Sequence, residues 1–139
     1  MGTFRSIEEA REFFKNDRFA TDNGMRIDEL FDGGCVCSME LTDAHRNAYG
    51  GTMGGVVFTL GDFAFAVSSN NDYQPTVALT VNVNFTAQPK GKRLIASSKC
   101  VKSGRTTCVY EIRVTDETGR DVALFACTGV KLAQSKRRA

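Results

Sequence analysis

The sequence predicts an α+β fold in which an antiparallel sheet curls around one long buried helix. Residues 54–67 are apolar on every side, which is typical of a helix enclosed by protein rather than one with a solvated face. Residues 76–85 alternate apolar and polar side chains with the period of a half-buried strand. Turn signals separate the later apolar segments, and short turns join antiparallel neighbours. A wholly apolar helix then needs a sheet to cover it.

The chain has 139 residues, of which 42% are hydrophobic and 24% charged. This size and composition predict one soluble globular domain over residues 1–139. The net charge of +2 favours neither nucleic acid nor a membrane surface as a partner. The basic residues near the C-terminus (Lys136, Arg137 and Arg138) are interpreted as part of a short solvated tail over residues 133–139.

Five cysteines lie mostly in apolar, strand-like segments: Cys35, Cys37, Cys100, Cys108 and Cys127. We expect them to be small buried hydrophobes in a reducing compartment. The spacing of the first two and a single histidine argue against a metal site. The charged N-terminus lacks the apolar core of a signal peptide, and the segment 54–67 is too short for a membrane span. These features predict a cytoplasmic protein without membrane association.

The remaining elements follow from local patterns. Ser6-Ile7-Glu8-Glu9 has the form of a capping box and starts an amphipathic N-terminal helix that ends near Asn16. Residues 25–30 and 35–41 predict a hairpin, and residues 42–51 predict a polar loop that leads into the central helix. Strands are expected at 76–85, 94–101, 108–114 and 122–132, with turns at 88–91, 103–105 and 116–119.

Asp62 is the one ionisable residue inside the apolar segment 54–67. A carboxylate in such surroundings has to be paired, hydrogen-bonded or used in a reaction. The alternative to a catalytic group is a structural carboxylate that accepts hydrogen bonds from a neighbouring Ser or Thr. Asp62 is therefore the first candidate for catalysis.

Gly54 and Gly55 open the same segment. Backbone N–H groups in the first turn of a helix lack intrahelical acceptors and lie at the positive end of the helix dipole. Glycines leave these donors accessible to a developing oxyanion. Close packing against another part of the protein is the alternative reason for glycine at these positions.

Several motifs together resemble one family, the PaaI-like acyl-CoA thioesterases of the hotdog fold. They are His45-x-Asn47-x-x-Gly50, Gly54-Gly55, Phe58, Leu60, Asp62, Ala64-Phe65-Ala66 and Asn70, followed by the strand 76–85, Pro89-x-Gly91, Gly104-Arg105 and the turn 116–119. The similarity covers about residues 6–132. It implies a curved antiparallel sheet wrapped around one helix, assembled into dimers and often tetramers. It also implies hydrolysis of acyl-CoA thioesters without a metal or a bound cofactor.

The resemblance implies roles for particular residues. Asp62 would attack the thioester directly or activate a water, and Gly54 or Gly55 would donate to the oxyanion. Asn47 would hydrogen-bond the thioester or the attacking water. Thr80 would orient a water beside Asp62, although its place on the polar face of a strand fits simple solvent exposure equally.

Other residues are candidates for substrate contacts. His45 lies in the loop before the helix, where it contacts substrate or holds the turn. Gly104-Arg105, with Lys102 nearby, would bind CoA phosphates, because arginine pairs with phosphate oxygens in bidentate fashion. An exposed turn arginine without a ligand is the alternative interpretation.

The sequence departs from the family at Met53, where the usual triplet is His-Gly-Gly. Methionine cannot donate or shuttle a proton, so any hydrogen bond from that histidine to the thioester is lost. Met53 motivates a second hypothesis, a catalytically silent acyl-CoA-binding module or regulator. The retained Asp62 argues against it, and a hotdog dehydratase is disfavoured because it needs a catalytic histidine.

Helix geometry predicts that the site is shared between two chains. Gly55 and Asp62 are seven residues apart, about 10 Å along a helix axis at ~1.5 Å per residue. One thioester carbonyl needs both groups within about 3 Å. Two antiparallel copies of the helix would bring the glycine end of one beside Asp62 of the other. We therefore expect a homodimer with interfacial sites, and the resemblance implies a further pairing of dimers.

Overall fold

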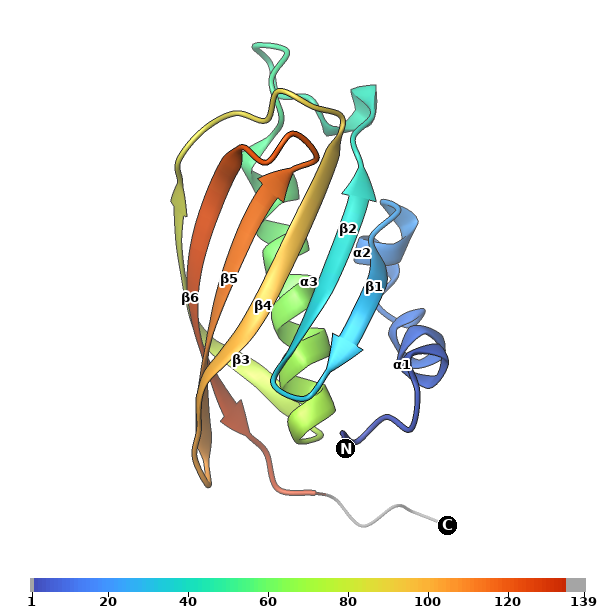
Figure 1. Cartoon of the computed structure of the whole chain (residues 1–139), viewed down its shortest axis with the longest axis vertical. Coiled ribbons are helices and arrows are strands. Elements are labelled where there is room, and N and C mark those ends of the chain that lie inside the picture. Colours follow the sequence, from blue (N-terminus) through green and yellow to red (C-terminus); the bar gives the residue numbers. More distant parts are fainter. Residues whose placement is uncertain (1, 135–139) are drawn as a thin grey trace.

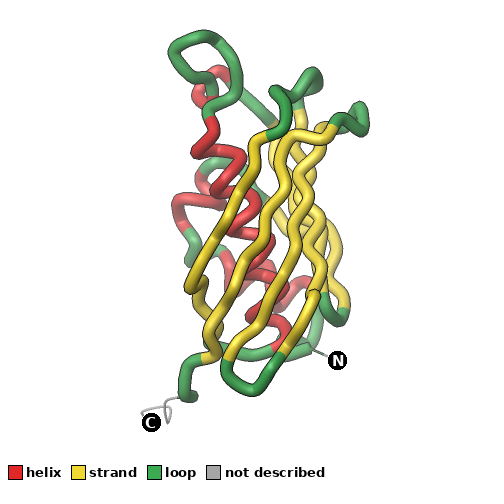
Figure 2. The backbone as a smooth tube through the Cα atoms, turned by 90° about the vertical axis from the view of Figure 1, so that its left-hand side faces the viewer, coloured by secondary structure: helices red, strands yellow, loops and turns green. Residues whose placement is uncertain are grey.

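One long helix lies across one face of a six-stranded antiparallel sheet in the computed structural model, which describes residues 2–134 (Figures 1 and 2). The helical elements are α1 (Ile7–Phe14), α2 (Arg18–Asp22), a 3-10 turn (Asp43–His45) and the long α3 (Gly54–Asp72). The strands are β1 (Arg26–Phe31), β2 (Gly34–Glu40), β3 (Thr76–Phe85), β4 (Arg93–Ser103), β5 (Thr107–Asp116) and β6 (Asp121–Lys131). This arrangement confirms the predicted fold class. The basic residues Lys136, Arg137 and Arg138 lie outside the described part of the chain.

The N-terminal helix α1 begins at the predicted cap residue Ser6, but only one of the two hydrogen bonds of the predicted capping box forms. The Ser6 hydroxyl accepts a hydrogen bond from the backbone N–H of Glu9 at 3.1 Å, whereas the Glu9 carboxylate accepts from Arg5 Nε at 3.2 Å. Phe14 packs edge-on against Phe63 of α3, with ring centroids 5.8 Å apart. The α1 helix is therefore anchored to the central helix by its apolar face.

The short helix α2 was not predicted. It has only five residues, so it offers too little sequence for a helical period to show. Its one buried residue, Ala20, joins the core beside α3. This helix matters for function because it covers part of the central helix.

The strand order β1-β2-β4-β5-β6-β3 puts β1 and β3 at the two edges. Three hairpins join sequence neighbours, as predicted, and Gly33 takes the left-handed conformation (φ +85°) in the first of them. Residues 88–91 were expected to form another such turn, and the antiparallel pairing of β3 with β4 that this implied is wrong, since these strands do not pair and the segment 86–92 connects them. Because β3 pairs with β6 while β4 pairs with β2 and β5, this segment crosses over the end of the sheet (Figure 1).

Strand β3 does not keep one apolar face along its length. A bulge falls between Ala78 and Thr80, and one extra residue moves every later side chain to the other face of the sheet. Thr76 is consequently buried while Val77 is exposed. Beyond the bulge Val83 lies opposite the buried Phe125 and packs on the core, as the alternation predicts.

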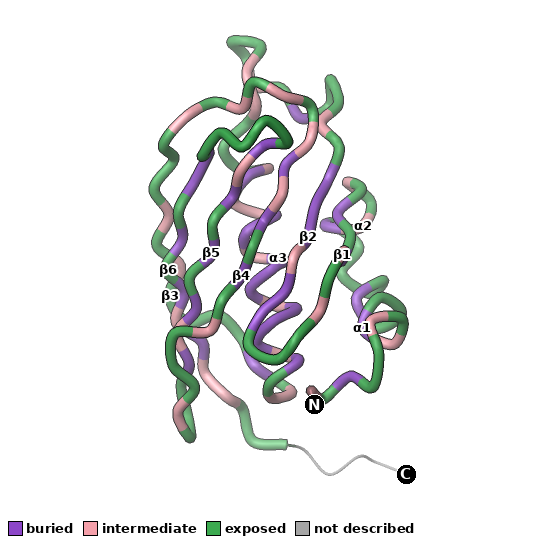
Figure 3. The backbone as a smooth tube through the Cα atoms, in the orientation of Figure 1, coloured by how far each residue is buried: buried purple, intermediate pink, exposed green. Residues whose placement is uncertain are grey.

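The central helix α3 is not enclosed on all sides within one chain, contrary to the expectation from its sequence. Most of its residues are buried, but one stripe at helical spacing is only half-buried (Figure 3): Thr59, Asp62, Ala66 and Asn70. At the C-terminal end of this stripe, Asn70 exchanges hydrogen bonds of 2.9 and 3.1 Å with the backbone of Thr76 in β3. Asp62 lies on this stripe and is accessible from outside the chain.

The five cysteines are free thiols, four of them buried and Cys100 half-buried, in agreement with their predicted packing role. Within residues 2–134, no helix combines the length and the apolar character needed to cross a membrane.

Candidate active site

Asp62 has an unpartnered carboxylate. No hydrogen bond or ion pair joins it to another residue in the described part of the chain. The nearest hydroxyl on its own helix face, that of Thr59 one turn earlier, donates instead to the carbonyl of Gly55 at 2.7 Å. Burial raises the pKa of Asp62, and the negative charge of Asp17 raises it further. The structural alternative, a carboxylate held by Ser or Thr, is therefore not what this site contains.

The start of α3 presents two unused backbone donors. Met53 is the N-cap residue and its side chain makes no capping hydrogen bond. The N–H of Val56 donates to the carbonyl of Met53 at 3.1 Å, but the N–H groups of Gly54 and Gly55 have no acceptor among residues 2–134. Both glycines are exposed. The donors therefore remain available to a substrate oxygen at the positive end of the helix dipole.

Packing within the chain does not require glycine at these two positions. A Cβ atom at Gly54 would lie 3.5 Å from the Phe85 ring, and one at Gly55 would lie 3.3 Å from the flexible end of Met53. At Gly61, by contrast, a Cβ atom would overlap the ring of Phe125. Gly61 is thus a packing glycine, whereas the small size of Gly54 and Gly55 leaves room for a molecule outside the chain.

The loop before α3 is held by its own side chains. The Asn47 Oδ1 atom accepts from the backbone N–H groups of Tyr49 (2.9 Å) and Gly51 (3.0 Å). Because backbone N–H groups occupy the oxygen, the amide orientation follows, and Asn47 Nδ2 has no acceptor among the described residues. Asn47 is therefore both a structural residue of the loop and a free donor near the helix start.

His45 is buried beneath the same loop. Its Nδ1 atom accepts from the backbone N–H of Thr42 at 3.0 Å, which assigns the proton to Nε2, and Nε2 donates to Asn23 Oδ1 at 3.1 Å. The His45 carbonyl accepts from the N–H of Met53. Both ring nitrogens are occupied, which favours the turn-holding interpretation over a substrate contact.

Gln88 was not singled out from the sequence, yet it fixes the entrance to α3. Its side-chain amide accepts from the N–H of Thr52 at 2.9 Å and donates to the carbonyl of the same residue at 3.4 Å. The buried carboxylate of Asp116 in turn accepts from the N–H groups of Lys90 and Gly91 and so anchors the segment that carries Gln88. The sequence around Gln88 and Pro89 predicts only a turn, and it does not indicate the contact with Thr52, which is 36 residues away.

The predicted CoA-binding turn lies far from the glycines within one chain. Ser103, between Lys102 and Gly104, donates to the Asp72 carboxylate at 2.7 Å, so the β4–β5 turn is tied to the C-terminal end of α3 (Figure 1). With 19 residues, α3 is roughly 28 Å long. Lys102, Gly104 and Arg105 can therefore serve the glycine end only from another copy of the chain.

Thr80 also lies away from Asp62 within one chain. It pairs with Thr128 of β6; the neighbouring Cys127 is buried, and a Cβ atom at Gly129 would meet the core residues Cys108 and Phe65. Directly opposed residues share a face, so the Thr80 side chain is on the outer face of the sheet. Its expected role beside Asp62 accordingly depends on a second chain.

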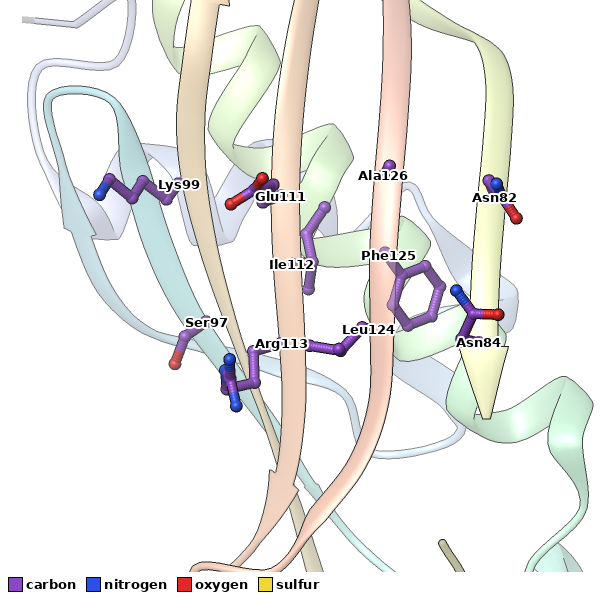
Figure 4. A pocket seen from close by; sticks show the side chains of 10 residues that line it. All are labelled: Asn82, Asn84, Ser97, Lys99, Glu111, Ile112, Arg113, Leu124, Phe125 and Ala126. Carbon is purple, nitrogen blue, oxygen red and sulfur yellow. The ribbon is translucent and has the colours of Figure 1, made fainter. Parts of the chain in front are cut away.

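A hollow of about 460 Å³ lies on that outer face (Figure 4). The charged side chains Lys99, Glu111 and Arg113 rise from β4 and β5, and Asn82 and Asn84 of β3 lie across β6 from them. Arg113 is already paired with Asp121 at 2.9 Å. Neither Asp62 nor the glycines of α3 line this hollow, so we place the candidate site on the helix side of the sheet.

Comparison with known proteins gives one family. The family model described as "Thioesterase superfamily" matches residues 49–123, which include the start of α3 and Asp62. The chain belongs to the thioesterase superfamily. Together with the fold, this makes it a PaaI-like thioester hydrolase of the hotdog type.

Three proteins illustrate the similarity. A putative esterase of Archaeoglobus fulgidus is 30% identical over 120 residues, which are 85% of this chain and 78% of that protein. The acyl-coenzyme A thioesterase PaaI of Escherichia coli is 29% identical over 122 residues, 87% of either chain, and its solved structure gives a TM-score of 0.86 over 91% of this chain and 92% of that one. A hypothetical thioesterase of Streptococcus pneumoniae solved with coenzyme A is 28% identical, with a TM-score of 0.80 over 88% of this chain and 99% of that one.

Proposed function

We propose that this thioesterase hydrolyses acyl-CoA thioesters, with Asp62 as nucleophile or base, at sites shared between two copies of the chain. The names of the Escherichia coli relative and of the coenzyme A complex from Streptococcus pneumoniae support CoA as the leaving group. One observation carries the proposal. An unpartnered carboxylate and two unused N–H donors lie on one helix, yet too far apart to reach one carbonyl.

Two antiparallel copies of α3 related by a two-fold axis would bring Asp62 of one copy close to the glycine N–H donors of the other. The half-buried stripe that carries Asp62 supplies a surface for the second copy, and the exposed edge strand β3 supplies unpaired backbone groups beside it. In such a dimer the C-terminal end of the partner's α3 lies near the glycines. The β4–β5 turn tied to that end then presents Lys102 and Arg105 to the CoA phosphates. Gly104 lets the turn approach them closely.

The chemistry follows from these groups. Either an Asp62 oxygen attacks the carbonyl carbon, or Asp62 removes a proton from a water whose oxygen attacks. The negative charge that develops on the carbonyl oxygen is stabilised by the N–H of Gly54 or Gly55. The C–S bond then breaks and CoA leaves as the thiol after taking a proton. In the first route water hydrolyses the mixed anhydride and regenerates Asp62.

Neighbouring residues complete the proposed site. Asn47 donates through its free Nδ2 to the thioester or the attacking water. Met53 places an apolar side chain beside Gly55 where the family has histidine, and so adds no hydrogen bond to the thioester. Thr80 takes part only if the second copy brings Asp62 to its side of the strand. We propose that no metal or cofactor is needed.

The test is release of free thiol from a panel of aryl-, short- and medium-chain acyl-CoAs. Asp62→Asn is expected to lower the rate at least about 10²-fold while the protein stays folded and dimeric. Glu12→Gln is the control, because it makes the same change of charge at an exposed residue of α1 that pairs with Lys15. Dialysis against a chelator should leave the wild-type rate unchanged.

Two results would contradict the proposal. Full activity in Asp62→Asn would exclude Asp62 as nucleophile or base. A wild-type protein that binds CoA esters but releases no thiol from any of them would establish the silent binding module instead.

A further inference from the structure

A hollow of about 250 Å³ opens beside Asp62, where α2 approaches α3. Its lining combines apolar side chains with two carboxylates: Asp17, Arg18, Phe19, Ala20, Thr59, Asp62 and Phe63. The hollow is larger than the roughly 150 Å³ cavity that holds benzene in another protein. Phe19 forms one wall and is 72% exposed, so its ring is open to a ligand in the hollow.

The negative charge of this hollow is not compensated within the chain. The Asp17 carboxylate does not cap α2 and has no hydrogen bond or ion pair with another described residue. Arg18, the one cation in the lining, pairs instead with Asp22 on the outer side of α2 at 3.8 Å. Burial raises the pKa of Asp17, and Asp17 contributes to the raised pKa of Asp62. The two carboxylates therefore act on the same small space.

A bound thioester has two arms that leave the reacting carbonyl in different directions. The CoA arm carries several phosphate charges and is repelled by two carboxylates. The acyl arm is apolar in its simplest forms and matches a wall made of Phe19, Ala20 and Phe63. The hollow at Asp62 can therefore receive the acyl arm but not the CoA arm.

We propose that this hollow is the acyl subsite, that Phe19 is its apolar wall, and that Asp17 excludes acyl groups ending in a carboxylate. This inference rests on the proposed function and adds a substrate class to it, neutral acyl groups. An anionic end would have to enter a space that already holds an unpaired carboxylate.

The test compares hexanoyl-CoA with adipoyl-CoA, whose acyl groups differ only in a terminal methyl against a terminal carboxylate. For each protein the ratio of kcat/KM for adipoyl-CoA to that for hexanoyl-CoA is measured. Adipoyl-CoA is also measured as a competitive inhibitor of hexanoyl-CoA hydrolysis, so that its binding is known even where its turnover is slow.

Asp17→Asn should raise this ratio at least about fivefold and tighten inhibition by adipoyl-CoA in proportion. That is the effect of one unit charge about 4 Å away even with the screening of bulk water. Glu12→Gln is again the control, since it removes the same charge from an exposed position on α1, and neither Glu12 nor its ion-pair partner Lys15 lines the hollow. Its ratio should stay at the wild-type value.

Phe19→Ala tests the wall independently of charge. It should lower kcat/KM for hexanoyl-CoA about tenfold, because the longer chain loses its apolar contact, and leave acetyl-CoA unaffected. Phe13→Ala is the control, because Phe13 is also an exposed phenylalanine but lies on α1 and does not line the hollow. If Phe19→Ala acted only by disturbing the fold, it would lower kcat/KM for hexanoyl-CoA and for acetyl-CoA by the same factor.

The outcomes separate the two proposals. If the wild type hydrolyses hexanoyl-CoA but Asp17→Asn leaves the adipoyl-to-hexanoyl ratio of kcat/KM unchanged, the acyl subsite is overturned and the proposed function stands. Loss of hexanoyl-CoA hydrolysis in a folded Asp17→Asn protein would also overturn it, because Asp17 would then act on the reaction itself. Failure of the wild type to cleave any acyl-CoA would overturn the proposed function and this inference with it.

Discussion

Replacing Gly54 with proline would delete one backbone N–H at the start of α3 and little else. Gly54 is the first helical residue, where proline is favoured because the N–H has no intrahelical acceptor. Proline also requires an extended residue before it, and Met53 already has φ −65° and ψ 133°. The substitution therefore removes a proposed oxyanion donor without disturbing the helix.

Activity and stability should change in opposite directions. Loss of one oxyanion donor is expected to lower kcat by about 10²- to 10³-fold, or ~2.7–4 kcal/mol of transition-state stabilisation. Stability should rise by about 0.4–1 kcal/mol, since proline restricts the unfolded chain at a position that already fits it. A damaged fold would instead lower both quantities.

The assay is thiol release to obtain kcat and KM, with thermal unfolding of the same samples. Gly54→Ala is the matched variant, because it keeps the N–H and places a Cβ atom at 3.5 Å from Phe85, an ordinary contact. The comparison between the two variants isolates the N–H group. A kcat for Gly54→Pro no lower than that for Gly54→Ala would refute donation by Gly54.

Two further predictions use the same variants. Gly54→Pro and Asp62→Asn, each inactive alone, should regain about a quarter of wild-type activity when mixed and allowed to exchange subunits, because half the dimers are then mixed and each has one intact site of two. Mixtures that stay inactive despite proven exchange would exclude a shared site. Asp62→Asn should also unfold at a higher temperature than wild type at neutral pH. The folded-state pKa of Asp62 is raised above 3.8, so its ionisation costs stability above the folded pKa and that cost disappears as pH falls below the unfolded value. The difference in unfolding temperature should therefore shrink as the pH is lowered toward 3.8, and equal stability at neutral pH would contradict the raised pKa.

Local patterns in the sequence were enough to predict the helix α3, the start of α1 and the hairpins. Each depends on residues close together in the chain, such as the Ser6 cap of α1 or Gly33 in the first turn. The apolar segment around Asp62 likewise isolates one carboxylate whatever the rest of the chain does. The sequence by itself therefore determined the fold class and the residue on which the proposed chemistry depends.

Other features were decided only by contacts between distant segments. The bulge beside Ala78 depends on the register of β3 against β6, and the crossover of residues 86–92 depends on which strand β4 pairs with. The approach of Asp17 to Asp62 depends on how α2 packs on α3, since α2 is too short to have a period of its own. Sequence patterns report the environment of a residue along its own element, whereas strand order, register and the charges that meet in a hollow arise from the packing of elements far apart in the chain.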